Sequence, residues 1–171
     1  KPLLKKIKDN AVAAVHPVLR TYFLYCDNDP ELLFTDNVTN NRRLFPDSPD
    51  ESQFVKDAFN NYLVHGQRGA VNPDSRGTKA AAHCILKIGA GKSATVKLRL
   101  ANEELAGKPF GAGFDQIMAD RLSEADEFYK SVTPPSVSAD SANVMRQAIA
   151  GMLWSKQFYF FDLNKWLKEH R

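Results

Sequence analysis

The stretch "TYFLYCDNDPELLFT", residues 21–35, decides the fold class of this chain. Its two ends, residues 21–26 and 31–35, are short apolar runs rich in aromatic or large aliphatic residues, which favour β-strands. The four residues between them, "DNDP", are typical turn formers. The sequence therefore predicts two strands separated by a turn, in a part of the chain that is mostly β-structure.

A second pair of strands is predicted further along. Residues 80–88, "AAAHCILKI", precede residues 94–100, "ATVKLRL", in which apolar residues alternate with Lys97 and Arg99. Alternation with a period of two is the pattern of a half-buried strand. The Gly-rich "GAGKS" between the two runs predicts a hairpin. It does not fit a phosphate-binding loop, because Leu86 stands where that motif needs glycine.

The rest of the first hundred residues is less regular. The opening "KPLLKKIK", residues 1–8, is also patterned like a strand, and its lysines suit a solvated face. Residues 37–79 are polar and rich in turn formers. Within them "FVKDAFNNYLVHG", residues 54–66, fits either a short helix or a strand.

The last seventy residues change to helical patterns. Residues 114–129, "FDQIMADRLSEADEFY", repeat apolar side chains at helical spacing. The segment "TPPS" at 133–136 ends that helix. A second helix is expected from about Ser141, whose hydroxyl would cap it, towards Leu167. The predicted class is therefore α+β: an antiparallel β-sandwich followed by two C-terminal helices.

Composition and motifs exclude several function classes. The net charge of this 171-residue chain is only +3, with charges of both signs mixed along it, so no nucleic-acid partner is indicated. No apolar run is long enough to span a bilayer and no signal peptide is seen, so we expect a cytoplasmic protein without a membrane partner. The four histidines and two cysteines lack metal-ligand spacing, so no metal site is expected. His83 in its apolar strand is best interpreted as a hydrogen-bonded core residue, and both cysteines are expected to be reduced.

No catalytic constellation is visible in this segment. The acids of residues 114–129 fall on the outward face of an amphipathic helix, where a solvated face is the better interpretation. These acids are Asp115, Asp120, Glu124, Asp126 and Glu127. We therefore expect no catalytic residue here.

The final helix is unusually aromatic. Its aromatic residues are Trp154, Phe158, Tyr159, Phe160, Phe161 and Trp166. Because the helix is apolar nearly all round, we expect it to be buried on several sides within a larger helical core that continues beyond Arg171. Aromatic rings mixed with lysine and glutamine also suit a sugar-binding site, which makes substrate-binding candidates of Trp154, Lys156, Gln157 and Tyr159. The alternative is that the rings are core and that Lys156 extends to water.

Five stretches resemble bacterial members of glycoside hydrolase family 63, which includes processing α-glucosidase I. They are "LLFTDNVTNNRRLF" (32–45), "FVKDAFNNYLVHG" (54–66), "VNPDSRGTKAAAHC" (71–84), "PFGAGFDQIMADRLSEADEFY" (109–129) and "NVMRQAIAGMLWSKQFYFFDLNKWLKEH" (143–170). The resemblance covers nearly the whole chain. It implies that residues 1–105 belong to an N-terminal β-supersandwich, 106–138 to a helical linker, and 139–171 to the first helix of an (α/α)6 barrel.

The resemblance also implies an activity for the parent protein. Such enzymes hydrolyse α-linked glucosides or related sugars with inversion, using one carboxylic acid and one carboxylate base. Both carboxylates would lie beyond Arg171, so the segment alone would be inactive. The carbohydrate substrate would be bound through the missing catalytic domain, and no cofactor is needed.

Two alternatives stay open at this point. One is a stand-alone β-sandwich that binds carbohydrate or a protein partner. The other is an oligomer in which two aromatic C-terminal helices cover each other.

Overall fold

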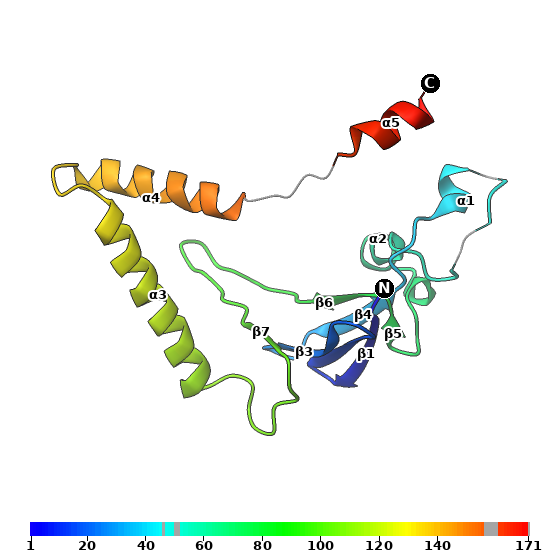
Figure 1. Cartoon of the computed structure of the whole chain (residues 1–171). Helices are drawn as coiled ribbons and strands as arrows, with labels where there is room; N and C mark the ends of the chain where they lie inside the picture. Colours follow the sequence, from blue (N-terminus) through cyan, green and yellow to red (C-terminus); the bar gives the residue numbers. More distant parts are fainter. Residues whose placement is uncertain (46, 50–51, 156–160, 171) are drawn as a thin grey trace. The chain divides into compact units, whose positions relative to one another are not determined.

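A computed structural model describes residues 1–45, 47–49, 52–155 and 161–170. The chain divides into two compact units, Lys1–Asp115 and Gln116–Arg171. The first contains every strand described, and the second contains most of the helical residues (Figure 1). The predicted α+β class, antiparallel sheets followed by C-terminal helices, is confirmed.

The larger sheet has five antiparallel strands in the order β5-β1-β2-β3-β7. In chain order they are β1 (Leu3–Lys8), β2 (Ala11–His16), β3 (Arg20–Cys26), β5 (Arg76–Gly77) and β7 (Leu98–Ala101). Sequence patterns did not predict β2, because alanine is a weak strand former. The register explains how it forms: Ala11 and Ala13 lie opposite Tyr25 and Phe23 of β3. Small residues thus face large ones across the pair.

The smaller sheet pairs β4 (Glu31–Thr35) with β6 (Lys79–His83). The turn "DNDP" therefore leads from β3 in one sheet to β4 in the other. Asn28 and Asp29 adopt positive φ angles of 64° and 42°, a conformation that Asn and Asp tolerate better than most residues. Local turn chemistry thus allows the sharp change of direction that separates the two sheets.

The predicted hairpin between residues 80–88 and 94–100 is wrong. β6 pairs with β4, whereas β7 pairs with β3, so residues 84–97 connect the two sheets. The β4–β6 register places Leu32, Leu33 and Phe34 opposite Ala82, Ala81 and Ala80. This complementarity of volumes, together with an available edge on each sheet, outweighs the local preference for a hairpin.

The polar region between β4 and β6 holds three short helical elements. They are α1 (Asn41–Leu44), α2 (Ala58–Leu63) and the 3-10 helix η1 (Arg68–Ala70). The ambiguous stretch 54–66 therefore contains a helix. Tyr62 of α2 and Val71 after η1 pack against Leu33 of β4 in one buried cluster. This contact packs α2 and η1 against the smaller sheet.

The second unit begins within α3 (Ala112–Val132) and continues with α4 (Ala139–Trp154) and α5 (Leu163–Glu169). The helix predicted at 114–129 is confirmed. The second predicted helix is wrong in two respects. Its cap is Ser138, whose hydroxyl accepts a hydrogen bond from the Ser141 amide at 3.1 Å. It is also not continuous, because α4 ends at Trp154 and Asp162 caps a separate helix through the Lys165 amide at 3.0 Å.

No residue of α3, α4 or α5 is buried. At the end of α4, Met152 is 73% exposed and Trp154 is 89% exposed. Within this unit Arg146 of α4 reaches Asp126 of α3 at 2.6 Å and stacks on the Tyr129 ring. The three-part division at residues 105 and 138 stays a prediction.

Candidate functional site

The most connected polar group in the first unit is the carboxylate of Glu31. Glu31 is the first residue of β4, and its register partner on β6 is His83. Side chains directly opposite each other in an antiparallel pair lie close together. The Nδ1 atom of His83 accordingly lies 3.0 Å from Glu31 Oε2. His83 is therefore hydrogen-bonded, as expected, but it is half-buried and not part of the core.

Two residues from the helical region complete this cluster. The hydroxyl of Tyr62 in α2 donates a hydrogen bond to Glu31 Oε1. Arg68 of η1 places its guanidinium 4.6 Å from the centre of the Tyr62 ring and 3.6 Å from Glu31 Oε1. Tyr62 is only 8% exposed, so the packing of α2 fixes its position. We call Glu31, Tyr62, Arg68 and His83 the Glu31 cluster.

Electrostatics keep Glu31 ionised. Hydrogen bonds from His83, and to a smaller extent from Tyr62, hold the pKa of the Glu31 carboxyl below its usual value. Partial burial acts in the opposite direction but is weaker. The pKa of Arg68 is raised, mainly by the neighbouring Tyr62 hydroxyl. The cluster therefore presents one carboxylate and one guanidinium side by side.

A cavity of about 350 Å³ lies beside these charges. Its polar lining comes from the cluster residues Glu31, Tyr62 and Arg68 and from Gln53, Asn72 and Ser75, and its apolar lining includes Leu33, Phe54 and Val71. Cavities of this size that combine an apolar lining with a few polar groups are typical of small-molecule sites. The arrangement is a candidate binding site; it offers no nucleophile paired with a base.

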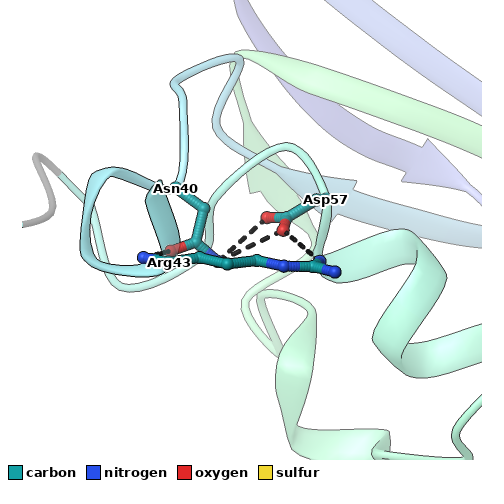
Figure 2. A network of polar contacts seen from close by, with 3 residues as sticks. All are labelled: Asn40, Arg43 and Asp57. Atoms are coloured by element: carbon teal, nitrogen blue, oxygen red, sulfur yellow. Dashed lines mark hydrogen bonds and ion pairs between the residues drawn. The ribbon is translucent and has the colours of Figure 1, made fainter. Parts of the chain in front are cut away.

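A second polar network lies at the start of α2 (Figure 2). The Asn40 amide donates hydrogen bonds to both oxygens of Asp57 at 3.2 Å, and Arg43 Nη1 lies 3.2 Å from Asp57 Oδ2. The Asn40 side-chain oxygen also caps α1 by accepting a hydrogen bond from the Arg43 amide at 3.0 Å. All three side chains satisfy one another. The network therefore ties α1 to the start of α2, which is a structural role.

The two cysteines are free thiols. Burial raises the pKa of Cys26 above its ordinary value, and the nearby Cys84 adds to this effect. A buried thiol with a raised pKa is a poor nucleophile. Among the described residues, no group of histidine, cysteine, aspartate and glutamate side chains is arranged to hold a metal ion.

The site residues predicted from the sequence fall at the end of α4 and beyond. Trp154 is the last residue of α4 and projects into solvent. Lys156, Gln157 and Tyr159 lie outside the described residues, so this sugar-binding set stays a prediction. All five acids of α3 are exposed, as expected. Three of them form ion pairs: Asp115 with Lys97, Glu124 with Arg121, and Asp126 with Arg146.

Sequence reasoning did not single out Glu31, Tyr62 or Arg68. They belong to three elements separated by long stretches of chain, and no local pattern marks residues that meet only after folding. The one available signal was His83, a polar residue within an apolar strand. Its register partner on β4 leads directly to Glu31.

Comparison with known proteins gives one informative match. The chain is 42% identical over 150 residues to the uncharacterized protein YMR196W of Saccharomyces cerevisiae. The matched region covers 82% of this chain but only 14% of the yeast protein, so the chain spans a small part of that relative. No protein-family model and no solved structure matches the chain. No helix in the described parts of the chain is both long and apolar enough to cross a membrane.

Proposed function

We propose that this chain is part of a larger inverting glycoside hydrolase, similar to family 63 enzymes, that acts on α-linked glucosides or related sugars. Two observations favour the proposal besides the five stretches that resemble this family. The chain has antiparallel sheets followed by helices, which is the order that the resemblance implies. It also matches a yeast relative of which it spans only 14%.

The single observation that carries the proposal is the uncovered apolar surface of the second unit. Met152, Leu153 and Trp154 at the end of α4 are all exposed, and no residue of α3, α4 or α5 is buried. Apolar surface left in water costs about 25 cal/mol for each Å². Such helices need further protein to cover them. In an (α/α)6 barrel, neighbouring helices would provide that cover.

On this proposal the catalytic acid and base belong to the parent protein outside residues 1–171. Trp154, Lys156, Gln157 and Tyr159 would contribute to the sugar-binding surface, by ring stacking and by hydrogen bonds to hydroxyls. The segment by itself would bind sugar weakly and would not hydrolyse it. No cofactor takes part in such a hydrolysis.

The test is an assay of the native full-length gene product. The purified product is incubated with α-linked glucose disaccharides, and proton NMR follows the anomeric signals of the released sugar. We expect β-glucose to appear first, because inversion converts an α-linkage into a β-product. The 171-residue chain serves as the control and should give no turnover. Absence of hydrolysis by the full-length product, or initial release of α-glucose, would contradict the proposal.

A second candidate is a stand-alone binding module, which the cavity beside the Glu31 cluster favours. This cavity lies wholly within the first unit and needs no other part of a parent protein. The intact mass of the native product distinguishes the two candidates. A product of about the mass of this chain would support the module and exclude the hydrolase.

A further inference from the structure

The cavity beside the Glu31 cluster carries opposite charges at adjacent positions. Glu31 and Arg68 both line it, and their closest atoms, Oε1 and Nη1, are 3.6 Å apart. Charge-assisted hydrogen bonds between such groups are usually about 2.7–2.9 Å long. The two side chains therefore form a loose ion pair, and a bound molecule can interact with both of them.

Each charged side chain is held in place by neighbouring residues of the Glu31 cluster. Arg68 is stacked on the ring of Tyr62, which is itself fixed in the buried cluster with Leu33 and Val71. The side chain of Arg68 is nevertheless 73% exposed, so several of its five N–H groups face solvent. Glu31 is anchored by Tyr62 and His83, yet its side chain is 42% exposed. Both groups are thus oriented in advance and accessible to a ligand.

The charges select the class of ligand. A simple anion would be attracted by Arg68 but repelled by Glu31, and a simple cation would meet the reverse situation. A molecule that carries both charges close together satisfies both side chains. The guanidinium fork matches the two oxygens of a carboxylate, whereas a carboxylate accepts hydrogen bonds from an ammonium group.

We propose that this cavity binds a zwitterionic α-amino acid with an apolar side chain. Arg68 holds the carboxylate of the ligand and Glu31 holds its ammonium group. The apolar side chain lies against Leu33, Phe54 and Val71, which supply part of the remaining lining beside the polar residues Gln53, Asn72 and Ser75. This binding function does not depend on the proposed hydrolase, because every residue involved belongs to the first unit.

Titration of the isotope-labelled 171-residue chain with L-leucine, followed by amide NMR, tests the proposal. Two further probes each lack one charge: 4-methylpentanoate has no ammonium group, and 3-methylbutylamine has no carboxylate. We expect saturable shifts of residues around the cavity with leucine, and binding at least about tenfold weaker with either single-charge probe. Equal binding of leucine and 4-methylpentanoate would overturn the assignment of Glu31.

Variants identify the residues responsible. Arg68→Gln should weaken leucine binding at least about tenfold without changing the spectrum of the rest of the unit, because its side chain is exposed. Arg76→Gln is the matched control: Arg76 is a similarly exposed arginine paired with Asp74, it does not line the cavity, and its loss should leave binding unchanged. Glu31→Gln should also weaken leucine binding. If that variant unfolds, Arg68→Gln still tests whether the cavity binds leucine. Absence of saturable shifts in the native chain, or unchanged binding by Arg68→Gln, would overturn the proposal.

Discussion

Gly77 of β5 lies directly against the backbone of Thr35 in β4, and this contact joins the two sheets. A Cβ atom on residue 77 would come within 2.8 Å of the Thr35 carbonyl carbon and even closer to its oxygen. Thr35 is fully buried and Gly77 is also buried. The two sheets can therefore approach each other this closely only because residue 77 has no side chain.

Gly77→Ala should destabilise the first unit by about 1–3 kcal/mol, the usual cost of inserting a methyl group into a packed site. The atoms that it meets are backbone, which cannot move aside as a flexible side chain does. Urea denaturation measures the change in the free energy of unfolding. Gly107→Ala is the control, because a Cβ there meets no atom within 4 Å. Equal stability of the two variants would show that the sheets can separate at no cost.

Thr35→Val should stabilise the chain by about 1 kcal/mol. The Thr35 hydroxyl is buried and has no hydrogen-bond partner among the described residues, so an apolar group of the same shape removes an uncompensated cost. Thr78→Val is the matched control: the Thr78 hydroxyl accepts a hydrogen bond from the Asn37 amide at 2.8 Å, and its loss should destabilise. Urea denaturation measures both effects as shifts of the unfolding midpoint, provided that the slope of the transition is unchanged. A destabilised Thr35→Val variant would reveal a partner for that hydroxyl.

The Glu31 cluster should make stability depend on pH in the acid range. The pKa of Glu31 is lowered in the folded chain, mainly by His83 and then by Tyr62. The stabilisation of the folded chain by ionised Glu31 is therefore fully present above the pKa of a glutamate in the unfolded chain, about 4.3. It is lost as the pH falls below that value and through the lower pKa of the folded chain. The contribution of Glu31 is measured by comparing the free energies of unfolding of the native chain and of Glu31→Gln at several values between about pH 7 and pH 3. Their difference in stability should shrink only in the acid part of the range; a constant difference would contradict the assignment.

Ser138→Ala should weaken the first turn of α4 by about 1 kcal/mol, because the hydroxyl caps the Ser141 amide. Amide hydrogen exchange in α4 measures this loss locally. Ser141→Ala is the control: it keeps the backbone amide that Ser138 caps and removes only the Ser141 hydroxyl, which accepts a hydrogen bond from the Ser138 hydroxyl at 2.9 Å. Its effect should be smaller than that of Ser138→Ala. The reverse order would restore Ser141 as the capping residue.

Local patterns predicted several elements of this chain correctly. Residues 21–26 and 31–35 form β3 and β4, and the helical spacing of 114–129 lies within α3. The wrong predictions concern which strands pair with each other and where the C-terminal helix is interrupted. Asp162 is a typical N-cap residue, but the aromatic pattern around it was interpreted as one continuous helix, so the separate helix α5 was not predicted. Nothing in the run 80–100 indicates that its two strands belong to different sheets. The Glu31 cluster was missed for the same reason.

The sequence by itself determined where β3, β4 and α3 form, because periodicity and turn residues act over a few neighbouring positions. Only the tertiary structure decided that β6 pairs with β4, that Gly77 meets Thr35, and that Glu31 meets Tyr62 and Arg68. These contacts join distant parts of the chain, and each depends on the volumes and charges available once the sheets have formed. Short-range sequence preferences cannot specify which distant segments meet, because that depends on how the strands pack.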